Sequence, residues 1–181
     1  MDPLRVFRAT RFKRWFNDLD KLAPLALLPR SALGLIREMT RHVLRHPVVG
    51  VMAIAKDQED RIVLIRRSDT GMWALPGGTL EWGETLREAL MREVREETGA
   101  SVTNIGPVVG VYSRPDRDPR FHAVSVVVWA DVRVTELAPS NPMEIREVRA
   151  FHRDDIPSAL SMGVEDMLYN AFKTQGAVVF E

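Results

Sequence analysis

The sequence contains no cysteine, which excludes disulfide bonds, thiolate nucleophiles and cysteine-ligated zinc. A chain without disulfides suits the reducing cytoplasm, where we expect this protein to work. Long apolar runs are also missing. The most apolar stretch, Leu22 to Ile36, is interrupted by Pro24 and Pro29 and is too short for a membrane-spanning helix. We therefore expect no integral membrane segment.

The chain also lacks an overall charge of either sign, because 25 basic residues balance 25 acidic ones. No global electrostatic field draws it to nucleic acid, which we do not expect as a partner. The balance is uneven along the chain: residues 1–46 carry a net charge of +6 and the remainder carries −6. With 181 residues, 45% of them apolar, the chain has room for one ordinary domain with an appendage.

Residues 1–46 form a basic N-terminal arm with helical periodicity. Apolar side chains recur every three to four residues between Phe7 and Leu19, and again between Leu33 and Val43. The intervening prolines divide the arm into two amphipathic helices. Such helices can bind an anionic membrane surface or a polyanion, but they more often pack on their own domain or across a dimer. We favour the second interpretation.

The remaining residues carry alternating strand and helix signals. Two apolar, β-branched runs, Val48 to Ala55 and Arg61 to Arg67, are separated by a polar turn, which predicts a hairpin. Three further strands and a closing helix are predicted at Val102 to Tyr112, Ala123 to Val134, Glu147 to His152 and Gly163 to Thr174. The apolar centre of the second of these strands predicts burial on both of its faces.

The segment from Gly77 to Ala100 reads GGTLEWGETLREALMREVREETGA and contains a well-marked helix. Thr85 followed three residues later by Glu88 is a capping box, which satisfies the first free amides of a helix. Gly99 fits the left-handed position that commonly ends one. The sequence therefore predicts a helix from about residue 85 to residue 98.

Three carboxylates, Glu93, Glu96 and Glu97, are crowded into five residues of this helix and repel one another. The neighbouring Arg92 cannot offset all of that charge, whereas a bound cation can. Oxygen ligands without cysteine or paired histidines favour Mg²⁺, or Mn²⁺, over zinc. Magnesium held by carboxylates usually shares its other positions with substrate phosphates, which implies a polyphosphate substrate. The alternative is that these glutamates are the solvated face of a surface helix.

The complete pattern resembles the signature box of the Nudix hydrolase family. Its parts are Gly78, five residues, Glu84, seven residues, and then Arg92, Glu93, Val94, Arg95, Glu96, Glu97, Thr98, Gly99 and Ala100. Seven fixed positions coincide by chance about once in 10⁸ to 10⁹ placements. The resemblance covers approximately residues 47–175. It implies an α/β fold, an α/β/α sandwich with a mixed β-sheet, as residues 47–181, with residues 1–46 as an N-terminal helical extension.

The resemblance also implies roles for single residues. Glu93, Glu96 and Glu97 are expected to bind one or more Mg²⁺ ions. The Gly77 carbonyl is expected to be a further ligand, and Arg92 to orient the carboxylates. In this family the metal ions polarise the phosphates and activate a water for in-line attack at phosphorus, so the protein is expected to be a pyrophosphohydrolase.

The general base in this family comes either from the box or from a glutamate on a later loop. Two residues in a suitable place are Glu144 and Glu147. We favour Glu144, because Glu147 adjoins a strand-like segment. The alternative for both is an ordinary surface carboxylate.

The substrate class is suggested by Pro115, fifteen residues beyond the box. A proline at this spacing resembles the ADP-ribose pyrophosphatase branch and its relatives that cleave nucleoside diphosphate sugars, such as GDP-mannose, to a nucleoside monophosphate and a sugar phosphate. Phe121 stands where close ADP-ribose pyrophosphatases have a glycine, which leaves room for other sugar nucleotides. The candidates for contacting phosphate or sugar oxygens are Arg66, Arg67, Arg114, Arg117 and Arg120.

Two other functional classes share this fold. A housecleaning nucleoside triphosphate pyrophosphohydrolase has the same box and releases pyrophosphate. A non-catalytic binding module usually has a degraded box, whereas the box of this chain is intact. The resemblance also implies a homodimer, because members of this branch commonly form intertwined dimers that build the site from both chains.

Overall fold

The computed structural model describes residues 46–118, 120–161, 163–173 and 177–181. The helices expected in residues 1–46 lie outside the described residues. The fold reported below is that of the compact unit Pro47–Glu181. No helix in the described part of the chain has the length and hydropathy needed to cross a membrane.

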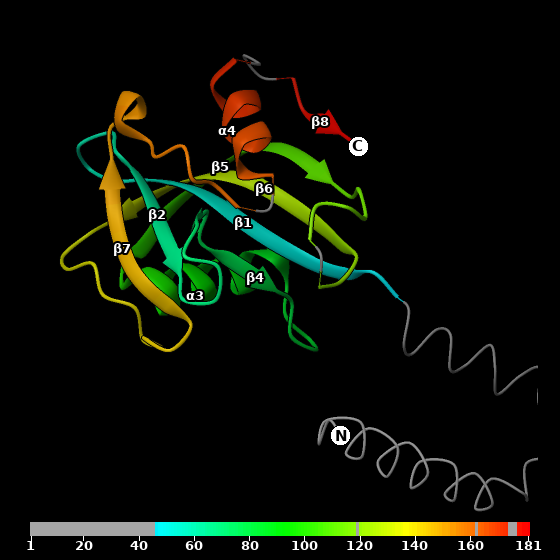
Figure 1. Ribbon diagram of the computed structural model, residues 1–181, viewed down its shortest axis with the longest axis horizontal. Coiled ribbons are helices and arrows are strands. Elements are labelled where there is room, and N and C mark those ends of the chain that lie inside the picture. Colours follow the sequence, from blue (N-terminus) through cyan, green and yellow to red (C-terminus); the bar gives the residue numbers. More distant parts are fainter. Residues whose placement is uncertain (1–45, 119, 162, 174–176) are drawn as a thin grey trace, which may run out of the picture. The chain divides into compact units, whose positions relative to one another are not determined.

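Strands and helices follow one another along this unit (Figure 1). The strands are β1 (Val48–Lys56), β2 (Ile62–Arg67), β3 (Trp73–Ala74), β4 (Gly77–Thr79), β5 (Ser101–Tyr112), β6 (Ala123–Arg133), β7 (Ile145–Phe151) and β8 (Val179–Phe180). The helices are α3 (Leu86–Thr98), α4 (Val164–Lys173) and the short 3-10 helix η2 (Arg153–Asp155). The elements predicted from residue patterns in this unit are confirmed to within two residues at each end. The three shortest strands, β3, β4 and β8, were not predicted.

The strands form one mixed sheet in the order β3-β2-β1-β6-β5-β8, with β4 also paired to β1 and β7 to β2. β1 runs parallel to β6 along its whole length, while β5 and β6 are antiparallel. The predicted hairpin of β1 and β2 is confirmed, but its pairing is limited to Ala55 with Val63 and Lys56 with Ile62. Nearer the N-terminus of β1, the same edge of this strand pairs with β4 and not with β2. This pairing inserts the segment before α3 into the sheet.

The two helices cover opposite faces of the sheet (Figure 1). Successive side chains of a strand point to opposite faces. Accordingly, Val51 and Ala53 of β1 pack in one buried cluster with Leu90 of α3, whereas Ile54 packs in a second cluster with Met167 of α4. Fully burying a side chain of this size contributes about 1.5–3 kcal/mol. The predicted α/β/α sandwich is confirmed, and α3 is fixed against the sheet by its buried residues Ala89, Leu90 and Val94.

Candidate active site

Helix α3 begins and ends as its sequence predicts. The Thr85 hydroxyl accepts a hydrogen bond from the Glu88 amide at 3.3 Å, and the Glu88 carboxylate accepts one from the Thr85 amide at 2.9 Å. Gly99 has a φ of 75° and its amide donates to the Arg95 carbonyl, so the helix closes in the left-handed conformation that glycine favours. These caps fix the register of the acidic residues between them.

Strand β4 brings two glycines onto the acidic side of α3. A Cβ atom at Gly77 would collide with the backbone of Val51 and Met52 in β1, and Gly77 has a φ of 152°, which side chains rarely adopt. A Cβ atom at Gly78 would collide with the carboxylate of Glu93. The absence of side chains on both glycines therefore lets the sheet edge and the helix approach each other.

Glu97 is the most buried carboxylate of the box, with only 9% of its surface exposed. It accepts a hydrogen bond from the Gly77 amide at 2.8 Å. Burial raises the pKa of Glu97 to about 8, and repulsion from Glu93 and Glu144 adds to this rise against the opposing amide hydrogen bond. Burial also raises the pKa of Glu93, while Arg92 opposes that shift.

Arg92 lies between three carboxylates. It donates two parallel hydrogen bonds to Glu84, Nε to Oε1 at 2.7 Å and Nη2 to Oε2 at 2.9 Å. Its Nη1 donates to Oε1 of Glu93 at 2.9 Å and lies 3.5 Å from Oε2 of Glu96. The hydrogen bonds from Arg92, with one from the Glu81 amide, lower the pKa of Glu84 to about 2. Glu84 therefore fixes the guanidinium, and the guanidinium in turn orients Glu93.

A cavity of about 400 Å³ opens beside these residues. Its lining includes the glycines of β4, the box residues Arg92, Glu93, Glu96 and Glu97, and five residues from other segments: Arg67, Asp118, Arg120, Phe121 and Glu144. Five carboxylates and three guanidiniums line it, so its formal charge is −2. A phosphate-bearing substrate is repelled by such a surface unless cations bind there as well.

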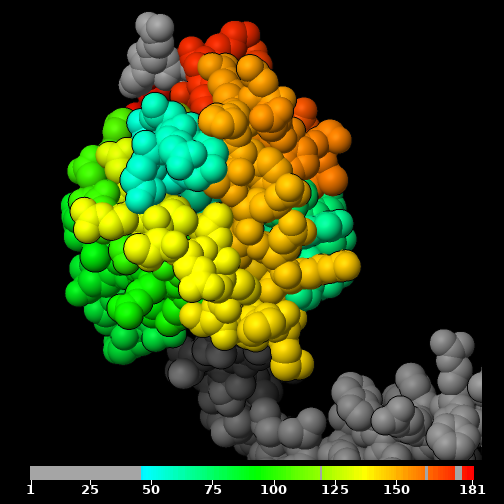
Figure 2. Space-filling view, turned by 90° about the vertical axis from the view of Figure 1, so that its left-hand side faces the viewer, coloured from blue at the N-terminus to red at the C-terminus, as the bar shows by residue number. Residues whose placement is uncertain are grey.

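Glu144 reaches this cavity from the segment between β6 and β7. That segment runs along the end of α3, where the Ser140 amide donates to the Glu96 carbonyl at 2.7 Å. The Glu144 carbonyl accepts from the Ser68 amide at 2.8 Å, directly after β2. Figure 2 shows the segment in yellow beside β7 in orange. The segment is thus held to α3 at Ser140 and to the residue after β2 at Glu144.

Of the five arginines predicted to contact substrate, the structure brings two, Arg67 and Arg120, into the cavity lining. Arg66 instead donates to the Gly71 carbonyl at 2.9 Å and to Glu147 at 3.4 Å. Neither Arg66 nor Glu147 lines the cavity. They are neighbours across β2 and β7, which accounts for their pairing.

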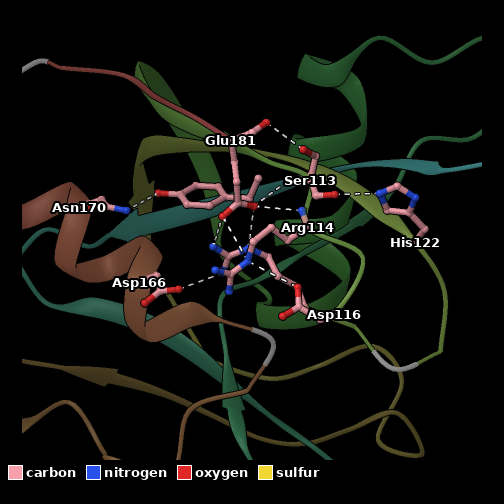
Figure 3. Close-up of polar contacts among 9 residues, drawn as sticks. Ser113, Arg114, Asp116, His122, Asp166, Asn170 and Glu181 are labelled. Carbon is pink, nitrogen blue, oxygen red and sulfur yellow. Dashed lines mark hydrogen bonds and ion pairs between the residues drawn. The ribbon is translucent and has the colours of Figure 1, made fainter.

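Arg114 and Arg117 also lie outside the cavity lining. The Arg114 side chain is half exposed beside Asp116, at 3.4 Å. Arg117 is 10% exposed and engages Glu181 and Asp166 in ion pairs of 2.6 and 3.2 Å (Figure 3). The guanidinium of Arg117 is thus enclosed by protein carboxylates.

Asp118 and Phe121 line the cavity without having been predicted to act there. Asp118 is buried and accepts two hydrogen bonds from the Arg120 guanidinium, at 2.9 and 2.7 Å. The ring of Phe121 lies 5.2 Å from the same guanidinium. The alternating arginines and aspartates between residues 114 and 120 were the available signal, because each arginine has an acidic neighbour one or two positions away.

Residues 44–170 match the NUDIX domain family. The chain belongs to the Nudix family. It is 41% identical over 115 residues to the ADP-ribose pyrophosphatase of Methanocaldococcus jannaschii, covering 62% of this chain and 66% of the relative. It is 39% identical over 73 residues to a putative 8-oxo-dGTP diphosphatase of Bacillus subtilis, covering 40% and 48%. The chain thus spans about half to two thirds of these curated relatives.

Among solved structures, the MutT Nudix hydrolase of Burkholderia pseudomallei superposes with a TM-score of 0.61 at 28% identity, covering 70% of this chain and 98% of that one. The Nudix domain of Shewanella oneidensis NrtR, solved with ADP-ribose, superposes with a TM-score of 0.62 at 20% identity, covering 83% and 95%. At that identity the second likeness shows the fold alone.

The Nudix box of this chain fits a divalent cation in its chemistry. Within the described residues, no three acidic or histidine side chains are already drawn together as a metal cluster. Buried Glu97 and partly buried Glu93 nevertheless repel each other, and Gly77 supplies backbone beside Glu97. Glu96 is more exposed, at 56% of its side chain. Oxygen donors with excess negative charge are the ligands that Mg²⁺ and Mn²⁺ prefer.

Proposed function

We propose that this Nudix protein hydrolyses the pyrophosphate bond of a nucleoside diphosphate sugar, such as ADP-ribose or GDP-mannose, to a nucleoside monophosphate and a sugar phosphate. The reaction depends on Mg²⁺ or Mn²⁺. One observation carries the proposal: a single cavity is lined by the box carboxylates together with Arg67, Arg120 and Glu144. The similarity to the M. jannaschii ADP-ribose pyrophosphatase supports the substrate class.

The metal site consists of Glu93, Glu96 and Glu97 with the backbone carbonyl of Gly77. When bound there, the ion neutralises the excess charge of the cavity and polarises the phosphates. Arg92 keeps the carboxylate of Glu93 turned towards the site through its 2.9 Å hydrogen bond. The fixed pair of Glu84 and Arg92 limits the reorganisation required when substrate enters.

Arg67 and Arg120 bind the diphosphate. Each guanidinium is oriented by a carboxylate of the protein: Asp69 accepts two hydrogen bonds of 2.9 Å from Arg67, and Asp118 accepts two from Arg120. A guanidinium has five N–H donors, so the two hydrogen bonds from Arg67 to Asp69 leave donors of Arg67 for phosphate oxygens. Oriented donors bind with a smaller loss of side-chain entropy than mobile ones.

Glu144 acts as the general base. It lines the cavity with the box glutamates, whereas Glu147 is paired with Arg66 outside that lining. The Glu144 carboxylate accepts a proton from the attacking water as its oxygen forms a bond to phosphorus. The anhydride P–O bond on the opposite side then breaks, and the leaving phosphate departs with the electron pair.

A second candidate function is hydrolysis of a nucleoside triphosphate with release of pyrophosphate. The similarity to a putative 8-oxo-dGTP diphosphatase of B. subtilis favours it. A non-catalytic Nudix-fold binding module is the third candidate. It is the weakest, because all three box glutamates are present.

The products distinguish these candidates. Purified full-length protein is incubated with Mg²⁺ and, separately, with ADP-ribose, GDP-mannose and a panel of nucleoside triphosphates, and products are identified by chromatography. Metal-dependent release of AMP or GMP with a sugar phosphate, absent from Glu97→Gln, is the expected result. Release of pyrophosphate from triphosphates alone would establish the second function, and no turnover of any compound would leave the binding module.

The same proposal includes a cytoplasmic homodimer, on the strength of the resemblance to the ADP-ribose pyrophosphatase branch. Light scattering behind size-exclusion chromatography is expected to give twice the chain mass of 20.5 kDa. A monomer at micromolar concentration would contradict the dimer and leave the proposed chemistry untouched.

A further inference from the structure

The segment 113–122 joins β5 to β6, and its two parts have different surroundings. Its second part carries Asp118, Arg120 and Phe121, which line the cavity. Its first part, from Ser113 to Arg117, is hydrogen-bonded to Glu181 and to Asp166 of α4 (Figure 3). Arg117 and Asp118 are consecutive residues. The contacts that hold the first part of the segment therefore also restrain the residues that line the cavity.

Most of the contacts that hold the first part of the segment are made by Glu181. β8 pairs in parallel with β5, and the Glu181 amide donates to the Val111 carbonyl at 3.1 Å. Its carboxylate then accepts hydrogen bonds from the amides of Ser113 at 2.9 Å and Arg114 at 3.0 Å. The Ser113 hydroxyl donates to the Glu181 carbonyl at 2.9 Å. One residue therefore satisfies two consecutive backbone amides where β5 ends.

Arg117 completes the arrangement. Its Nε and Nη2 donate to both oxygens of Glu181, at 2.9 and 2.6 Å, and its Nη1 donates to Asp166 of α4 at 3.2 Å. The guanidinium also lies 5.0 Å from the ring centroid of buried Tyr112. A Cβ atom at Gly163 would collide with it, so the start of α4 leaves a slot for this side chain.

The segment is also closed on itself. His122 Nε2 lies 2.8 Å from the Ser113 carbonyl oxygen, which joins the two ends of the loop. Between these ends, Asp118 accepts hydrogen bonds from the backbone and side chain of Arg120. The two ends of the segment contact each other, and Glu181 holds its first part through hydrogen bonds. These contacts fix the orientation of the second part relative to the cavity.

We propose that Glu181 and Arg117 are positioning residues for the substrate, because their ion pair fixes the segment 113–122 with Arg120 and Phe121 facing the cavity. Neither residue lines the cavity, so their proposed effect on the substrate is indirect. This inference rests on the proposed function, in which the cavity binds the nucleoside diphosphate sugar. It assigns Arg117 an indirect role in place of the direct substrate contact expected from its sequence position.

Hydrogen exchange tests whether the ion pair of Glu181 and Arg117 fixes the segment, without relying on activity. In full-length Glu181→Gln, the backbone amides of residues 113, 114, 116–118 and 120–122 are expected to exchange roughly tenfold faster than in the wild type, because the charge-assisted bonds to Arg117 weaken. Asp57→Asn is the matched control, since Asp57 is also an enclosed acid, more deeply buried than Glu181, and is paired with an arginine, Arg61, at 2.7 Å. It is expected to leave exchange in the segment unchanged. Unchanged exchange in Glu181→Gln would overturn the inference.

Steady-state kinetics test the consequence. Glu181→Gln is expected to raise the KM for ADP-ribose or GDP-mannose roughly five- to tenfold with kcat within about twofold, as expected when a binding interaction is loosened and the chemistry is spared. Asp57→Asn is expected to change neither value. A fall in kcat with an unchanged KM indicates loss of folded enzyme and would overturn the positioning role. If the wild type is inactive on every sugar nucleotide, the proposed function is refuted. Hydrogen exchange then still shows whether Glu181 fixes the segment.

Discussion

The amide of Gly77 donates a hydrogen bond of 2.8 Å to Oε2 of Glu97, twenty residues further along the chain. This bond joins β4 to α3 and gives the buried carboxylate a neutral partner. A carboxylate at this depth usually has a cationic partner, since burying a charge is costly. Glu93 and Glu144 add repulsion that one amide cannot offset. The fold is therefore expected to gain stability when a cation binds beside Glu97.

Mg²⁺ is accordingly expected to raise the melting temperature of the wild type. A ligand at one hundred times its Kd contributes about 2.7 kcal/mol, or roughly 5–10 °C for a chain of this size. Glu97→Gln is expected to lose most of that increase, measured by differential scanning fluorimetry with EDTA and with Mg²⁺. The exposed Glu165→Gln serves as the control and should keep the full increase. An equal response in all three proteins would contradict the assigned metal site.

Gly78→Ala tests the close approach between β4 and α3. The added methyl group collides with the carboxylate of Glu93, which can move aside because it is the end of a flexible side chain. We expect the fold to persist and kcat to fall by about 100-fold or more, since small displacements of catalytic groups are costly. Gly71→Ala is the comparison, because nothing lies within 4 Å of its Cβ position and only its φ of 70° is strained. It is expected to lose about 1 kcal/mol of stability and no activity.

Arg92→Lys tests whether the guanidinium acts through its shape. A lysine keeps the charge but cannot donate two parallel hydrogen bonds to Glu84 while also bonding Glu93. We expect kcat to fall about tenfold or more, and we expect Glu84→Gln, which weakens the same pair, to lower it less. Product release from ADP-ribose is the measurement. Full activity of Arg92→Lys would show that charge alone suffices.

Glu144→Gln and Glu147→Gln form a natural pair for the general base. Both glutamates belong to one short stretch of sequence, but Glu144 lines the cavity and Glu147 is paired with Arg66. We expect kcat to fall about 100- to 10,000-fold for the first and less than about twofold for the second. If Glu144→Gln keeps a kcat within about twofold of the wild type, Glu144 is not the base.

The sequence predicted the parts of this site that are encoded locally. The caps at Thr85 and Gly99 and the spacing of the box glutamates are patterns within one helix, and their geometry follows from the helical repeat. β4 was missed because three residues are too few to show a periodic pattern, and its pairing with β1 is decided by tertiary contacts. Trp73 of β3 is buried in the core, where its ring packs edge-on against that of Phe151 at a centroid distance of 4.9 Å.

The ion-pair partners of the arginines could not be predicted from the sequence, because they too depend on tertiary contacts. Arg117 and Arg120 lie three residues apart in a stretch of alternating charge, and both were equal candidates for substrate contact. The partner that distinguishes them, Glu181, is 64 residues from Arg117 in the chain. Long-range ion pairs of this kind depend on which strand adds to the sheet edge, here β8 beside β5.

Acidification is expected to destabilise the protein through Glu181. Hydrogen bonds from Arg117 and from two backbone amides lower the pKa of Glu181 to about 2, from a value near 4.5 in the unfolded chain. Because the folded pKa is the lower one, the charged carboxylate contributes its stability fully above pH 4.5 and loses it as the pH falls towards 2.

The gap in unfolding free energy between the wild type and Glu181→Gln measures this contribution. We expect about 1–2 kcal/mol at pH 7, since the Glu181 side chain is only 19% exposed, and a gap that narrows steadily between pH 5 and pH 3. Glu84 and Asp69 also have pKa values lowered to about 2, but they are present in both proteins and cancel in the difference. Urea denaturation across this pH range is the measurement. A gap that stays constant with pH would mean that Glu181 stabilises the fold through packing and neutral hydrogen bonds, and that its charge contributes nothing.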